Sequence, residues 1–89
     1  MYPMKVLAVK DVVKKDLAVD YRKVYDARAV LEILGTSQET KIEISLEHSP
    51  LGGVDVKVRL LEDVAYPLLP ALRALRTSVH GMYERGELS

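Results

Sequence analysis

Few residues in this chain are of a type that could carry out catalysis or bind a metal. The sequence has no cysteine and two histidines, which excludes disulfides, thiolate ligands and thiol nucleophiles. His48 falls in a predicted loop and His80 in a distant predicted helix, and neither has a carboxylate at ligand spacing, so we predict no metal site. A hydrolytic triad would need Ser49 or Ser78 beside a histidine and an acid, but neither serine has the context of a nucleophile elbow. We therefore expect a protein that is not an enzyme and needs no cofactor.

Residues that could contact other molecules fall into two groups. Arg73, Arg76 and His80 are spaced three and four apart, so they share one side of a predicted helix, where they could touch RNA phosphates or be a solvated helix face. Tyr21 and Tyr25, which we predict to lie one helical turn apart, could be a ridge for a protein partner or the edge of the core. The 13 basic and 13 acidic residues give a net charge of zero, so no overall charge attracts the chain to nucleic acid.

The clearest structural signal is a β-hairpin over residues 41–62. Apolar and polar residues alternate on both sides of a short loop, 48–53, in which Gly52 and Gly53 permit positive φ. This alternation predicts one buried face, made of Ile42, Ile44, Leu46, Val54, Val56, Val58 and Leu60. The opposite face carries charges of both signs that suit cross-strand pairing, made of Lys41, Glu43, Ser45, Glu47, Asp55, Lys57 and Arg59.

The elements around the hairpin are predicted from spacing and end signals. Residues 5–13 are β-rich and predict a strand, and 17–19 either pair back as a short second strand or lead into a helix. A helix is predicted over 21–34, with Asp20 as N-cap and Gly35 as C-cap. Its apolar residues recur at three and four, at Val24, Ala27, Val30, Leu31 and Leu34. The polar residues 36–39 then predict a loop.

A final helix is predicted to begin near Tyr66–Pro67 or Pro70–Ala71, because proline is tolerated in a first turn. Gly86 is its predicted stop. The stripe predicted to face the sheet is Leu68, Leu72, Leu75, Val79 and Met82.

Together these elements predict one α+β domain over residues 1–89. The expected architecture is a small two-layer sandwich, β(β)αββα, with two helices on one face of an antiparallel sheet. A chain of 89 residues builds only a thin core, so we expect a homodimer. The N-terminal residues fit neither a signal peptide nor a membrane span, which predicts a cytoplasmic protein without membrane contact. The lack of Phe, Trp and Cys is typical of a thermophilic habit.

The order of elements and several short runs resemble a known family. The runs are residues 24–31, 40–47, 54–60, 71–74 and 77–78. They resemble the small dimerisation subunit of the KEOPS complex over about two thirds of the chain, including its leucine–arginine–alanine step and, at Ser78, the serine of its asparagine–serine pair. Members of that family have a β-α-β-β-α layout.

The resemblance implies a non-catalytic scaffold that pairs with itself or a paralogue and docks onto a catalytic subunit for threonylcarbamoylation of tRNA adenosine. It implies that Leu72, Leu75 and Val79 divide between the core and a helical partner interface, and that Arg73 and Arg76 flank that interface or face tRNA. Two alternatives stay open. One is a small RNA-binding module using Lys41, Lys57 and Arg59, although single-strand readers normally add exposed aromatic residues. The other is a regulatory dimer with a ligand pocket between two copies.

Overall fold

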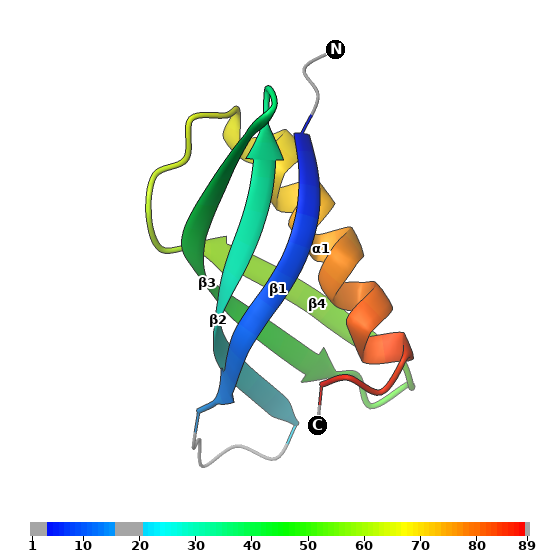
Figure 1. Cartoon of the computed structure of the whole chain (residues 1–89). Helices are drawn as coiled ribbons and strands as arrows, with labels where there is room; N and C mark the ends of the chain where they lie inside the picture. The colour runs from blue at the N-terminus through cyan, green and yellow to red at the C-terminus, as the bar shows by residue number, and fades with distance from the viewer. Residues whose placement is uncertain (1–3, 16–20, 89) are drawn as a thin grey trace.

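The structure is a computed structural model that describes residues 4–15 and 21–88. These residues form a four-stranded antiparallel sheet in the order β1-β2-β3-β4, followed by one helix (Figure 1). The elements are β1 (Met4–Lys14), β2 (Arg22–Ile33), β3 (Thr36–His48), β4 (Val54–Leu60) and α1 (Leu68–Glu84). The α+β class is confirmed, but the described residues contain one helix rather than the two we predicted.

The predicted helix over 21–34 is wrong, because these residues form β2. Five alternate residues are buried, at Tyr25, Ala27, Ala29, Leu31 and Ile33. The segment therefore carries a period of two as well as the spacing of three and four, and pairing with β1 and β3 along its length selects the strand. The predicted 36–39 loop belongs to β3 for the same reason.

A two-residue turn joins β2 to β3. Ile33 pairs with Thr36, and the residues between them, Leu34 and Gly35, have φ of 51° and 81°. Two successive positive φ values are typical of the type I′ hairpin turn, which matches the twist of the flanking strands. Gly35 therefore supplies a positive φ as predicted, but in a hairpin turn instead of a helix cap.

The β3–β4 hairpin is confirmed with the predicted faces. Ile42 pairs with Leu60, and the register continues without interruption to His48 opposite Val54. The loop tip is closed by hydrogen bonds from Ser49 N–H to the Gly53 carbonyl, 3.1 Å, and from Gly52 N–H to the Ser49 carbonyl, 3.0 Å. Gly52 and Gly53 both have φ of 89°, as the sequence predicted.

The predicted first strand is confirmed as β1, and its irregular apolar pattern has a structural cause. The register with β2 shifts between Val6 and Ala8 and again between Lys10 and Val13. Each shift is an irregularity of the β-bulge kind, which interrupts the alternation of side chains. Asp11, within the second shift, has a φ of 53°. The alternatives for 17–19 and the predicted N-cap at Asp20 lie outside the described residues.

Helix α1 begins at Leu68, with Pro67 at the N-cap, so Pro70 lies in the first turn where its missing N–H is not needed. The face packed on the sheet consists of Ala71, Leu75, Val79 and Met82. Two predicted members of that face differ from the prediction: Leu68 is 57% exposed and Leu72 is half-buried. The buried face is rotated toward Ala71, whose small side chain lets the helix approach the sheet closely.

The end of α1 is a Schellman motif. Gly86 N–H donates to the Tyr83 carbonyl, 3.0 Å, and Glu87 N–H donates to the Met82 carbonyl, 2.9 Å. Gly86 has a φ of 73°, so the predicted stop is confirmed. The motif turns the chain back toward the sheet, and Leu88 enters the core.

The sheet curls, and α1 lies along its concave side in contact with both edge strands, β1 and β4 (Figure 1). The core lies between the helix and the inner faces of β2 and β3. One polar atom in it is unpaired: the hydroxyl of Thr40 on β3 is buried and has no hydrogen-bond partner among the described residues.

Candidate interaction surface

The three predicted RNA-contact residues lie on the exposed side of α1. Arg73, Arg76 and His80 are all exposed, as the spacing predicted. Arg76 Nη2 is 3.8 Å from an Asp55 carboxylate oxygen, and His80 Nδ1 is 3.1 Å from the Glu84 carboxylate. Two of the three thus have an acidic neighbour, which lowers their capacity to attract phosphate.

The five predicted partner-binding residues separate into two groups. Tyr25, Leu75 and Val79 are at most 2% exposed and belong to the core, so they present no surface to a partner. Tyr21 is 56% exposed and Leu72 is half-buried. The predicted ridge of Tyr21 and Tyr25 is wrong, because Tyr25 lies on a strand and its side chain faces the core.

The histidines and serines lie apart, without a catalytic arrangement among the described residues. His48 stacks edge-on against Tyr83, with ring centroids 6.4 Å apart. The Ser49 hydroxyl accepts a hydrogen bond from Leu51 N–H, 3.2 Å, within the loop. Within residues 4–15 and 21–88 no three His, Asp or Glu side chains are grouped in a way that could hold a metal ion.

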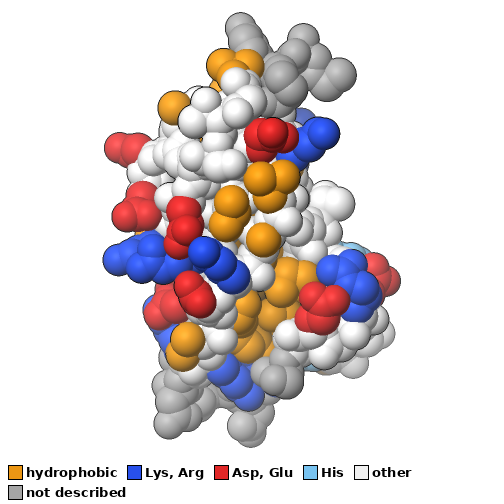
Figure 2. All heavy atoms as spheres, viewed as in Figure 1, with side chains coloured by type: hydrophobic (Ala, Val, Ile, Leu, Met, Phe, Trp, Pro, Cys, Tyr) orange, Lys and Arg blue, Asp and Glu red, His pale blue; other side chains and the backbone are white. Residues whose placement is uncertain are grey.

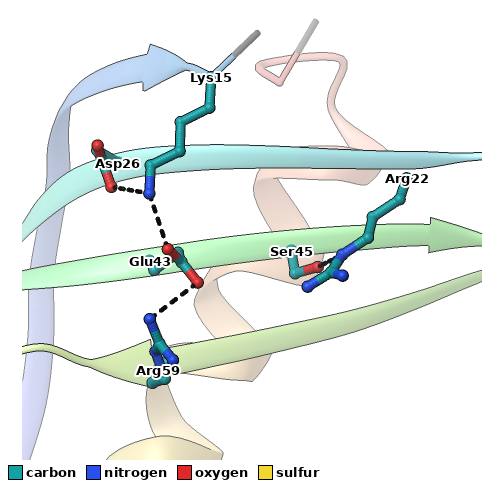
Figure 3. Close-up of polar contacts among 6 residues, drawn as sticks. All are labelled: Lys15, Arg22, Asp26, Glu43, Ser45 and Arg59. Atoms are coloured by element: carbon teal, nitrogen blue, oxygen red, sulfur yellow. Dashed lines mark hydrogen bonds and ion pairs between the residues drawn. The ribbon is translucent and has the colours of Figure 1, made fainter. Parts of the chain in front are cut away.

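The outer face of the sheet carries a network of opposite charges (Figure 3). Lys15 Nζ lies 2.9 Å from Glu43 and 3.3 Å from Asp26, and Arg59 lies 3.4 Å from Glu43. Beside them, Arg22 Nε donates to the Ser45 hydroxyl, 3.1 Å. The network links β1, β2, β3 and β4 by side chains that cross the sheet.

The network shifts the ionisation of its members. The hydrogen bond to Glu43, and then that to Asp26, raises the pKa of Lys15. The hydrogen bond from Lys15 and the nearby charge of Arg59 lower the pKa of Glu43, against a smaller opposing effect of burial. Each charge therefore stabilises the ionised form of its neighbour.

The cations proposed for an RNA-binding face are largely neutralised there. Lys57 lies 3.8 Å from Glu47 and 3.7 Å from Asp55, and Arg59 pairs with Glu43. Figure 2 shows one face of the molecule, on which basic and acidic side chains intermingle and hydrophobic side chains are exposed beside them. The surface seen there has no extended basic area of the kind that binds a phosphate backbone.

The free edge of β4 is regular. Leu61 N–H donates to the Lys41 carbonyl, 3.0 Å, one step beyond the pairing of Ile42 with Leu60. Because bonded and non-bonded pairs alternate in an antiparallel ladder, the odd-numbered residues of β4 direct their backbone groups toward β3. The even-numbered residues direct theirs to the edge, where no other described strand pairs with β4. These residues are Val54, Val56, Val58 and Leu60.

A groove of about 470 Å³ lies along this edge, between β4 and α1. We call it the β4–α1 groove. Strand β4 lines it with residues 55–58, and the helix lines it with Leu69, Leu72, Arg73 and Arg76. The four helix residues are spaced three, one and three apart, so they share one side of α1. Leu69 is 65% exposed.

Sequence reasoning missed this groove. It assigned Leu72 to the core-facing stripe and left Leu69 without a role. A usable signal was present: the run Leu68–Leu69 places apolar residues on two sides of a helix that needs only one apolar side for the core. The unpaired edge of β4 could not be inferred while 21–34 was read as a helix.

Comparisons with known proteins give one match. The model of a family described as the BB-0187 family matches residues 2–84. Comparison with curated proteins and with solved structures gives no match. The β-α-β-β-α layout that contributed to the KEOPS resemblance is not the layout of these described residues. Separately, α1, the helix that the structure describes, is too short and too polar to cross a membrane.

Proposed function

The chain belongs to the family whose model matches residues 2–84, and we propose that it is a non-catalytic protein-interaction subunit that works as a homodimer. The observation that carries the proposal is the β4–α1 groove. It combines an unpaired, regular strand edge with exposed leucine on the adjoining helix. Such an edge is a template for pairing with another chain, and natural proteins normally blunt or cover it.

The groove offers a physical gain on association. An edge strand presents backbone donors and acceptors that an added strand can pair, and the helix leucines beside it bury apolar surface at the same step. Full burial of a leucine side chain is worth about 1.5–3 kcal/mol. The small size of the chain points the same way, because a thin core is stabilised when a second subunit covers one of its margins.

An RNA-binding module is the less favoured function. The sheet face that would bind RNA pairs its cations with Glu43, Glu47 and Asp55. Bound phosphates would have to compete with these carboxylates. The complex that the subunit would serve is proposed from the KEOPS resemblance alone, as the assembly for tRNA threonylcarbamoylation.

Molar mass by light scattering tests the proposal. The wild-type chain is expected at about 20 kDa, twice the 10.0 kDa of one chain. Leu69→Asp places a charge in the groove and is expected to give 10.0 kDa. Leu34→Asp is the matched control, because Leu34 is 64% exposed against 65% for Leu69 but lies at the β2–β3 turn.

Circular dichroism should show both variants folded, because both leucines are exposed. A wild-type chain that stays monomeric at 100-fold different concentrations would overturn the proposal. So would equal dissociation of the dimer by Leu34→Asp. A monomer whose mass changes only when tRNA is added would replace it with the RNA-binding module.

A further inference from the structure

We propose that the occupant of the β4–α1 groove is a second copy of this chain, whose β4 pairs antiparallel with β4 about a two-fold axis through Val56. The inference rests on the proposed function and deepens it by naming the partner and its register. It follows from three observations: the direction of the free backbone groups, the order of charges along β4, and the position of the helix leucines.

The backbone directions restrict the possible registers. Only residues that direct their N–H and C=O groups to the edge can form the bonded pairs of a new antiparallel ladder. On β4 these are the even-numbered residues, from Val54 to Leu60. Even residues must therefore meet even residues, and side chains of opposing residues lie on the same face of the joined sheet. This leaves three compact two-fold registers, centred on Val56, Lys57 or Val58.

The charges select among the three registers. Centred on Val56, Asp55 lies opposite the partner's Lys57, and the symmetry repeats this pair. Centred on Lys57, two Lys57 side chains face each other at the middle, although Asp55 would meet the partner's Arg59. Centred on Val58, Lys57 lies opposite the partner's Arg59 twice. Opposite charges in directly facing positions stabilise a sheet and like charges destabilise it, so only the first register has attraction without repulsion.

The facing charges are available for this exchange. Lys57 and Asp55 are exposed, with side chains 66% and 52% accessible, and lie 3.7 Å apart within one chain. Asp55 also lies 3.8 Å from Arg76, whose side chain reaches across the strand edge from α1. These contacts are long for charge-assisted hydrogen bonds, so little is lost when each charge turns to the partner strand.

The apolar residues are self-complementary in the same register. Val56 lies opposite the partner's Val56, and Val54 lies opposite the partner's Val58, all on the face that carries α1. A two-fold axis perpendicular to the joined sheet places both helices on that face. Leu69 and Leu72, on the side of α1 that lines the groove, then lie near the seam between the two subunits.

Charge exchange tests the register by sedimentation equilibrium. Lys57→Asp puts two acidic pairs at the seam and is expected to raise the dimer dissociation constant at least tenfold. Asp55→Lys combined with Lys57→Asp restores both opposite-charge pairs and is expected to return the constant to within about threefold of wild type. Arg76→Ala is the matched control on the other wall of the groove and is expected not to weaken the dimer. Tighter association of Lys57→Asp would overturn the register, because that is the outcome for an axis through Lys57.

Engineered cysteines give an independent test, because the native chain has none. In the proposed register residues 55 and 57 of different chains lie about 4.5 Å apart at Cα, within disulfide reach. Residue 55 of one chain lies about 8 Å from residue 55 of the other, beyond that reach. A mixture of Asp55→Cys and Lys57→Cys chains is expected to form a disulfide-linked dimer under mild oxidation, and neither variant alone should do so.

The outcomes separate the two proposals. A wild-type dimer that Leu69→Asp dissociates, but that ignores Lys57→Asp and gives no mixed disulfide, overturns the β4 pairing and leaves the interaction function standing. A monomeric wild-type chain overturns both.

Discussion

The two edges of the sheet are built in opposite ways. Strand β1 has 11 residues and two register shifts, one of them at a residue with positive φ, Asp11. Strand β4 has seven residues and pairs with β3 without a shift. Bulges twist an edge out of register with any incoming strand, whereas a regular edge can be extended.

This difference indicates which edge is protected and which is available. Both edges contact α1, so the helix alone does not distinguish them. The bulges on β1 use local backbone distortion to prevent pairing, and β4 has no such device among its described residues. Exposed leucine lies beside β4 as well, so the edge that is open to hydrogen bonding is also the one that gains from apolar burial.

The largest expected effect comes from removing the helix that both edges share. Leu75 is fully buried between α1 and the sheet, and Leu75→Asp puts an unpaired charge there at a cost of several kcal/mol. We expect loss of the circular dichroism signal and of the thermal transition. Leu69→Asp, on the same helix but exposed, is the control and should melt within a few degrees of wild type. A folded Leu75→Asp chain would contradict the placement of the helix.

Proline substitutions sharpen the comparison within β4 itself. Lys57 directs its N–H toward β3, so Lys57→Pro should remove a ladder hydrogen bond and cost about 1–3 kcal/mol. Val58 directs its N–H to the free edge, so Val58→Pro should be better tolerated and should block dimer formation. Urea denaturation at low concentration measures the first effect and light scattering the second. The reverse order of stabilities would show that the strand directions are assigned wrongly.

A smaller effect is expected midway between the edges. Thr40 lies on β3 with its hydroxyl buried and unpaired among the described residues, and Thr40→Val removes the desolvated hydroxyl while keeping the shape. We expect stabilisation of up to about 1 kcal/mol. Urea denaturation measures it, with exposed Thr36→Val on the same strand as control. Destabilisation by Thr40→Val would show that the hydroxyl has a partner.

The smallest effect concerns the charges that fasten the end of β1 to the sheet. The hydrogen bond from Lys15 holds the pKa of Glu43 below its ordinary value of 4.5. A lowered pKa means that the stabilisation is complete above pH 4.5 and declines as the pH falls through the folded-state value. Glu43→Gln should therefore lower the melting temperature slightly at pH 6, and the difference from wild type should shrink toward pH 3. A difference that grows with acidity would have the wrong sign.

The parts of the fold that could be predicted from sequence are those with a single consistent period. Residues 41–62 alternate strictly, and the hairpin formed with the predicted faces. Residues 71–82 carry a stripe that only a helix places on one side, and α1 formed there. Gly86 and Gly52 were identified correctly because positive φ is a local requirement of the backbone.

The parts that failed were decided by contacts distant in sequence. Residues 21–34 fit both periods, and only the pairing of β2 with two neighbours selects the strand. The groove at β4 depends on this outcome, because the number of strands determines which of them lies at an edge. Burial of Tyr25 follows as well, since its side chain direction depends on the strand register.

The Schellman motif at the end of α1 sets a practical limit on shortening the chain. The family match ends at residue 84, yet Gly86 and Glu87 close the helix and Leu88 fills part of the core beyond it. A version cut after Glu84 would leave the Met82 and Tyr83 carbonyls without these partners and an apolar hollow under the helix. Tags and fusions for the experiments above therefore belong at the N-terminus, and a homology boundary is not a folding boundary in this protein.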